Sequence, residues 1–151
     1  MLRPTVLILV VLTSSPLLYA AGLSTTLSEV KLEHLQLGHQ YSLKESGGVA
    51  LTVVNTGDEP VELIVDPLLA TQEELKPGYE PLPDLVWVAI VTNHFTVPAA
   101  GTATSDILIS IPNDSRYRGK RYQCYIWSHT IGHAIGVGLK SRVLLSVSEE
   151  P

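Results

Sequence analysis

The sequence predicts an all-β protein built as an antiparallel sandwich or barrel. Short runs of β-branched and apolar residues recur along the chain, and turn residues separate them at fairly regular intervals. No segment keeps a helical period with caps over ten residues, although ATQEELKPG (70–78) is able to form a single turn. Seven or more short strands with regularly spaced turns are typical of such a sandwich or barrel.

The expected strands follow one another along almost the whole chain. Alternation is clear in VELIVDP, where Val61, Leu63 and Val65 share one face and Glu62 and Asp66 share the other. The turn TGDEP precedes this run. We expect strands within 29–37, 41–45, 49–55, 61–67, 85–92, 105–112, 121–128 and 141–149.

Three of these runs allow a prediction of which side chains face the core. In the first strand, Val30, Leu32 and Leu37 are expected to face inward. In 105–112 the inward residues are Ile107, Ile109 and Ile111, and in 121–128 they are Tyr122, Cys124 and Ile126. The run LVWVAIVT (85–92) is apolar throughout, as in a strand that is buried on both faces or in an apolar run whose structure the pattern leaves ambiguous.

The N-terminus has the layout of a secretory signal peptide. Arg3 is followed by a seven-residue apolar run from Val6 to Leu12, and small residues precede an expected cut after Gly22. A membrane-spanning helix needs about 20 apolar residues, which this run does not reach. We therefore expect residues 1–22 to be a signal peptide and residues 23–151 to be one domain that is secreted to the periplasm or cell surface, without an integral membrane segment.

Charge and cysteine content limit the classes of partner and the means of stabilisation. The formal net charge is −5, and loss of Arg3 with the signal peptide makes it −6. An acidic protein is poorly suited to nucleic acid or an anionic membrane. The single cysteine excludes an internal disulfide, so the core must hold the fold without one.

One connection is much longer than the short turns between the other expected strands. It contains Pro67, Pro77, Pro81 and Pro83 between the strands at 61–67 and 85–92. Loops of this length are uncommon, and some are mobile or functional. We expect an ordered crossover between the two sheets, made stiff by proline.

Three stretches together resemble an immunoglobulin-like β-sandwich of the bacterial extracytoplasmic kind, with about seven to nine strands. They are GGVALTVVNTGDEPVELIV, FTVPAAGTATSDILISIPND and YRGKRYQCYIW, and they cover most of residues 45–148. The chain is similar to accessory domains of secreted and cell-wall proteins, including the N-terminal domains of WxL-type surface proteins. This resemblance implies binding, adhesion or scaffolding by a non-catalytic module that needs no cofactor. The partner would be a protein or a cell-wall or surface polymer.

Tyr122-Gln123-Cys124 matches the Tyr-x-Cys of a tyrosine corner. We expect the Tyr122 hydroxyl to hydrogen-bond a nearby backbone group while its ring packs. Cys124 lies on the same strand face as Tyr122, and its neighbours there are apolar. We expect it to be a small buried residue, with pairing between chains as the alternative.

The spacing of Cys124, His129 and His133 leaves one metal hypothesis open. It is similar to the copper loop of cupredoxins, in which a cysteine and two histidines hold copper. In this alternative, an electron-transfer protein would use Cys124 and His129, with His94 or His39 as the third ligand. No methionine is present for the axial position outside the leader, and our main expectation is no metal. A metzincin zinc helix is rejected, because Thr130 stands where the catalytic glutamate belongs.

The histidines at 129 and 133 are better explained by a hairpin between the last two strands. The segment SHTIGHAIGVGLK is rich in glycine, and it is unusually apolar for a loop. It is expected to cover one end of the sandwich or to meet a partner. The candidate partner-binding residues are Ile131, His133, Ile135 and Val137, together with Arg116 and Arg118 of the basic segment RYRGKRY, whose ordinary role is a solvated loop.

No arrangement of residues in the sequence indicates catalysis. No serine lies in a Gly-x-Ser-x-Gly context, and no phosphate-binding loop is present. The sequence therefore predicts a binding or structural module rather than an enzyme.

Overall fold

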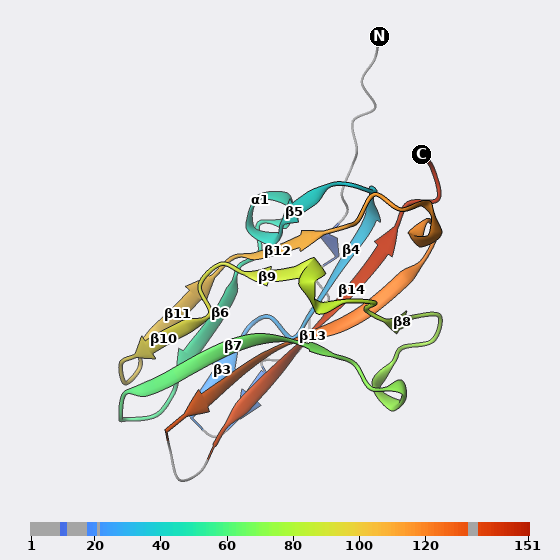
Figure 1. The fold of residues 1–151 in the computed structure, drawn as a ribbon. Coiled ribbons are helices and arrows are strands. Elements are labelled where there is room, and N and C mark those ends of the chain that lie inside the picture. Colours follow the sequence, from blue (N-terminus) through green and yellow to red (C-terminus); the bar gives the residue numbers. More distant parts are fainter. Residues whose placement is uncertain (1–9, 12–17, 21, 133–135) are drawn as a thin grey trace.

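Two β-layers packed face to face make up the structure, a computed structural model that describes residues 10–11, 18–20, 22–132 and 136–151 (Figure 1). The predicted all-β, immunoglobulin-like sandwich is confirmed. Strand segments β1 to β14 occur within the described ranges, and several of them are consecutive parts of one longer strand path. Among these residues no helix is long and apolar enough to span a membrane.

The larger layer contains the two longest strands of the fold. Its order is β1-β4-β14-β13-β7-β10, and β8 pairs in parallel with the start of β13. Strand β4 runs parallel to β14, whereas the other neighbours along this path are antiparallel. The bounds are β1 (Val10–Val11), β4 (Glu29–Leu35), β14 (Gly138–Val147), β13 (Arg121–Ile131), β7 (Val61–Leu69), β10 (His94–Val97) and β8 (Glu80–Pro81).

The second layer consists of two shorter sheets, ordered β11-β6-β3-β2 and β5-β12-β9. Asp106 alone separates β11 from β12, and helix α1 (Leu43–Gly47) separates β5 from β6, so two strand paths continue from one sheet into the other. The bounds are β2 (Leu18–Ala20), β3 (Leu23–Thr25), β5 (Gln40–Ser42), β6 (Leu51–Asn55), β9 (Val88–Ile90), β11 (Thr102–Ser105) and β12 (Ile107–Ser110).

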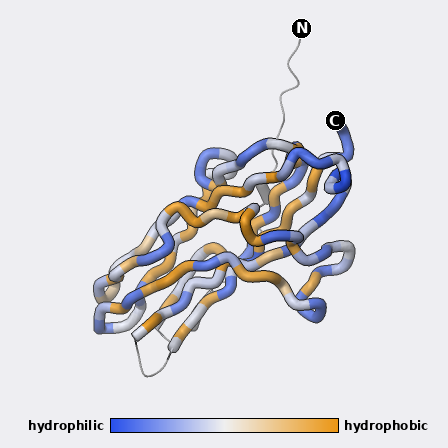
Figure 2. The backbone as a smooth tube through the Cα atoms, viewed as in Figure 1, coloured by the Kyte–Doolittle hydropathy of each residue, from blue (hydrophilic) through white to orange (hydrophobic). Residues whose placement is uncertain are grey.

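Alternating side chains of the two layers form one hydrophobic core. Inward-facing residues include Leu32 on β4, Leu63 on β7, Ile109 on β12 and Ile126 on β13, all of them inaccessible to solvent. Figure 2 shows hydrophobic residues along the strands and hydrophilic residues at turns and at the C-terminal end. The predicted inward faces of 105–112 and 121–128 are confirmed, because Ile107, Ile109, Ile111, Tyr122, Cys124 and Ile126 are all buried.

A strand, β9, lies within residues 85–92, but the interpretation of the whole run as a strand buried on both faces is wrong. A 3₁₀ turn, η2 (Leu85–Trp87), precedes the short edge strand β9, and the Asp84 carboxylate caps the turn by accepting the Val86 N–H. Trp87 and Val88 are buried, but Val86 is 76% exposed and Val91 is 60% exposed. An edge strand buries only one face, so an entirely apolar run did not indicate a fully buried strand here.

Two further expectations fail for local reasons. Residues 43–45 form the start of α1 instead of a strand, because the Ser42 hydroxyl caps the Glu45 N–H and Gly48 ends the helix in the left-handed region. In β4, His34 has a φ of 61°, which interrupts the alternation. Leu35 is therefore fully buried, and Leu37 is only partly buried.

The long connection after β7 is the ordered crossover that the sequence predicts. It contains the 3₁₀ turn η1 (Gln72–Glu74) and β8, and it leads from the larger layer to β9 in the second layer. The buried Gln123 side chain holds it. Its amide oxygen accepts the Lys76 N–H at 2.8 Å, and its amide nitrogen donates to the Glu74 carbonyl at 2.9 Å.

The Asn55 side chain hydrogen-bonds the backbone of two turns at one end of the sandwich. Its side-chain nitrogen lies 2.7 Å from the Glu59 carbonyl and 3.2 Å from those of Val97 and Pro98. Its oxygen accepts the Gly57 N–H at 3.0 Å. The β6–β7 and β10–β11 turns, which are distant in sequence, therefore share one buried amide.

Asn55→Ala is expected to lower the free energy of unfolding by about 2–4 kcal/mol, because several buried backbone groups lose their partner. Urea denaturation of both proteins measures this difference. Thr104→Ala, at an exposed position on β11, is the control and is expected to change stability by less than about 0.5 kcal/mol. An Asn55→Ala protein as stable as the control would contradict this role.

Candidate functional site

Strand β13 places Cys124 and His129 on opposite faces of the larger sheet. The Cys124 side chain is inaccessible in the core, which confirms its predicted burial, and burial raises the pKa of its thiol to about 12. His129 lies five positions along the same strand and hydrogen-bonds Asp66 on the outer surface. Side chains alternate along a strand, so residues an odd number apart face opposite ways.

The residues of the copper alternative are therefore not brought together. His94 lies on the outer side of β10, where its ring contacts Glu62. His39 lies between β4 and β5, and its ring nitrogen lies 2.9 Å from the Leu37 carbonyl. Within the described residues, no three histidine, cysteine or carboxylate side chains gather as a set that could hold a metal.

The tyrosine-corner expectation is met in its packing alone. The Tyr122 ring packs edge-on against Trp87, with ring centres 5.4 Å apart. Burial raises the pKa of its hydroxyl to about 12, and the nearby charge of Glu80 adds to this. Among the described hydrogen bonds it is the Tyr41 hydroxyl that returns to the backbone, accepting the Gln36 N–H at 2.8 Å.

The candidate partner-binding residues fall at opposite ends of β13. Arg116 and Arg118 precede the strand, in and after the 3₁₀ turn η3 (Ser115–Tyr117), and Ile131 is its last residue. An eleven-residue strand is about 33 Å long, so these groups form no single site. Arg116 is paired with Asp114 at 2.9 Å, as expected for a solvated loop.

The predicted hairpin between the last two strands is present. Ile131 is 36% exposed, whereas Val137 is partly buried against the core and pairs with Thr130. The other two candidates, His133 and Ile135, lie outside the described residues. Of the hairpin candidates that the structure describes, Ile131 therefore offers the more accessible apolar surface.

Ile131 belongs to a wider surface on the outer face of β7 and β13. The strand register places Trp127 opposite Asp66, His129 opposite Ile64, and Ile131 opposite Glu62. Their inward-facing neighbours Leu63, Val65, Ser128 and Thr130 are buried. We call this surface the Trp127 face, and it consists of Glu62, Ile64, Asp66, Trp127, His129 and Ile131.

The indole of Trp127 is held in a defined position on this face. It stacks on the His129 ring, with ring centres 3.8 Å apart and planes 20° apart. Gly138 lies opposite His129 on β14, and a Cβ there would be 2.8 Å from the indole nitrogen. The absence of a side chain at Gly138 thus leaves room for the indole, which remains 36% exposed.

Each carboxylate of the Trp127 face contacts a histidine. Glu62 contacts His94 Nε2 at 2.6 Å and accepts the Thr96 hydroxyl at 2.6 Å. These two hydrogen bonds, from Thr96 first and His94 second, hold the pKa of Glu62 below its ordinary value. His129 Nε2 lies 3.1 Å from Asp66. The face therefore combines apolar groups with two carboxylates.

The other half of the outer face is occupied by ion pairs. Lys76 and Arg142 both contact Glu29 at 2.9 Å, and Lys140 contacts Glu74 at 2.9 Å. Desolvation raises the pKa of Glu29, but the hydrogen bonds and charges of Lys76 and Arg142 outweigh it and make the net shift downward. The crossover is therefore fixed over β14 and the start of β13.

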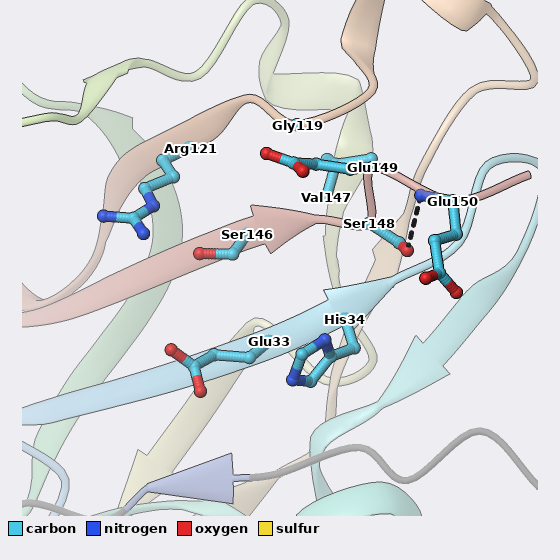
Figure 3. A pocket seen from close by; sticks show the side chains of 9 residues that line it. All are labelled: Glu33, His34, Gly119, Arg121, Ser146, Val147, Ser148, Glu149 and Glu150. Carbon is cyan, nitrogen blue, oxygen red and sulfur yellow. Dashed lines mark hydrogen bonds between the residues drawn. The ribbon is translucent and has the colours of Figure 1, made fainter.

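A polar hollow of about 490 Å³ lies where β13 begins and β14 ends (Figure 3). Glu33, His34, Arg121 and Glu149 line it, and the Glu150 N–H donates to the Ser148 hydroxyl at its margin. None of the candidate residues from the sequence lies in it. Its carboxylates and single arginine carry mixed charge, which favours no one class of ligand.

Trp127, Glu62 and Asp66 were not among the candidates from the sequence. Alternation predicts that Glu62 and Asp66 share an outward face, and it places Trp127 opposite the core side of its strand. The register between β7 and β13 could not be read from the sequence. It places Trp127 opposite Asp66 and Ile131 opposite Glu62.

No protein-family model matches the chain, and the search of curated proteins gives no match. Solved structures do match in fold. The PapD-like domain 7 of human CEP192 has a TM-score of 0.61 at 9% identity, with 100% of this chain and 95% of that one covered. The match supports a single domain with an immunoglobulin-like sandwich fold.

Two further matches involve parts of longer chains. A family 123 glycoside hydrolase from Clostridium perfringens has a TM-score of 0.56 at 9% identity, with 82% of this chain and 23% of that one covered. The class 5 fimbriae chaperone CfaA has a TM-score of 0.52 at 8% identity, with 85% and 57% covered. Such low identities show the fold alone. They do not support the narrower resemblance to WxL-type proteins.

The buried thiol leads to a direct chemical prediction. In the native protein, Cys124 is expected to react with an aromatic disulfide reagent at least about 100-fold more slowly than in denaturant, because the reactive thiolate is suppressed and covered. The absorbance of the released thiolate measures the rate. Equal rates in native and denatured protein would place this thiol at the surface.

Proposed function

We propose that this protein is a non-catalytic binding module that acts outside the cytoplasm and engages a protein partner through the Trp127 face. The observation that carries the proposal is the pair of exposed apolar side chains, Trp127 and Ile131, on the outer side of β13. Exposed apolar groups gathered on one face are typical of interaction sites.

The rigidity of this surface favours binding. Strand β13 is paired with β14 on one edge and with β7 on the other, and the Trp127 ring is stacked on His129. Side chains that are already ordered lose little conformational freedom when a partner binds. Tryptophan is also one of the residues that most often dominate the energy of protein interfaces.

The described residues favour binding over catalysis. Cys124, the one cysteine of the chain, is enclosed in the core with its thiol protonated. His94 and His129 each contact a carboxylate on an open sheet surface, whereas catalytic groups usually converge in a concave pocket. The same fold in the fimbrial chaperone CfaA adds support for a protein partner.

The proposed location rests on the N-terminal sequence, in which residues 1–22 have the layout of a removable leader. Removal would leave Leu23, the first residue of β3, as the new N-terminus. Strands β1 and β2, which pair with the outer edges of β4 and β3, lie within the removed segment.

Protein recovered from outside the cytoplasm of the producing cells is expected to have an intact mass that corresponds to residues 23–151. Mass spectrometry of the whole chain, followed by N-terminal sequencing, makes this measurement. A full-length mass in the extracytoplasmic fraction would contradict leader removal, and recovery from the cytoplasm alone would contradict the location.

The binding surface can be tested with a photo-crosslinking phenylalanine analogue in place of Trp127 or of Ile131. Irradiation of the producing cells is expected to give a discrete adduct of higher mass on denaturing gels, and mass spectrometry identifies the attached protein. The analogue at Thr104, exposed on β11 of the second layer, is the control and is expected to give none.

The absence of adducts at both Trp127 and Ile131, from variants whose circular dichroism matches the parent, would overturn the proposal. Equal adducts at Thr104 would show unspecific contact and would also overturn it.

A further inference from the structure

The outer face of the larger sheet is divided by charge. On β4 and β14, and on the crossover that lies over them, every carboxylate in an ion pair has a lysine or arginine as its partner: Lys31 with Glu33, Lys76 and Arg142 with Glu29, and Lys140 with Glu74. That half needs no external cation. The Trp127 face differs from it.

Histidine takes the place of lysine and arginine in the ion pairs of the Trp127 face. Glu62 contacts His94, and Asp66 contacts His129; among the described ion pairs, neither carboxylate contacts a lysine or an arginine. Histidine carries a positive charge only when it is protonated, whereas lysine and arginine are permanently charged at neutral pH. Two carboxylates therefore present negative charge around the apolar side chains of Ile64 and Trp127.

The position of the Trp127 indole adds a second attraction for cations. Trp127 lies opposite Asp66 in the register, and the His129 ring both stacks on the Trp127 indole and contacts the Asp66 carboxylate. Because Asp66 is 47% exposed and Trp127 is 36% exposed, a lysine or arginine side chain above this group would have both a negative charge and an aromatic surface nearby. Tryptophan is the best aromatic partner for such a cation, and the net charge of −5 draws basic partners towards the chain.

We propose that the Trp127 face binds an extended basic segment of the partner protein, an inference that rests on the proposed function. One basic side chain contacts Asp66 beside the stacked rings of Trp127 and His129, and a second contacts Glu62. These carboxylates are four residues apart on β7, or about 13 Å along the strand. An extended segment repeats this distance between its own residues i and i+4, and residue i+2 then faces Ile64.

The test is an NMR titration of the full domain with the capped peptide Ser-Arg-Ser-Val-Ser-Arg-Ser. The indole N–H of Trp127 is expected to shift and saturate, while that of the buried Trp87 stays in place. Asp66→Asn and Glu62→Gln are each expected to weaken binding by about five-fold. Glu150→Gln, at the far end of β14, is the matched control and is expected to leave the affinity unchanged.

Two control peptides test the chemistry and the spacing. Replacing both arginines with glutamate is expected to abolish the shift, and placing the arginines next to each other is expected to weaken it. No Trp127 shift with the first peptide, or equal affinity for the parent, Asp66→Asn and Glu62→Gln, would overturn the inference. If crosslinks at Trp127 and Ile131 nevertheless form, the proposed function stands and only the basic character of the partner is refuted.

Discussion

The pairing of β13 along both of its edges is the constraint on which the fold and the candidate surface depend. Strand β14 pairs with residues 121–129 on one side, and β7 pairs with residues 124–131 on the other. Because this pairing fixes the strand in the middle of the sheet, each residue must face either the core or the solvent. Cys124 and Ile126 complete the interior, while Trp127 and His129 are presented outside.

Two buried side-chain amides hold the connections between strands in place by hydrogen bonds to the backbone. Asn55 binds the backbone of two turns at one end, and Gln123 binds the crossover to the outer face of β13. In both cases a neutral side chain satisfies backbone groups that would otherwise lose hydrogen bonds on burial. Gln123 and Tyr125 are buried beside the crossover, whereas Trp127, further along the same face of β13, is exposed.

The sequence was sufficient to predict the layers, the inward faces of two strands and the final hairpin, because these depend on alternation and glycine-rich turns. At 85–92 the sequence predicted a fully buried strand, but the apolar run forms a turn and an edge strand. In β4 the predicted alternation fails at His34, because its positive φ shifts the faces of the residues that follow. The Trp127 face could not be found in the same way. It depends on which residue of β7 lies opposite which residue of β13, and no local pattern specifies that register.

The parallel pairing of β4 with β14 has a mechanical consequence. These are the first long strand and the last strand of the chain, and they lie side by side, joined by a ladder of backbone hydrogen bonds. A force that pulls the two ends of the domain apart would slide β4 and β14 past each other and load many of these bonds at once, rather than opening them one after another. The domain is thus arranged to resist tension between its termini.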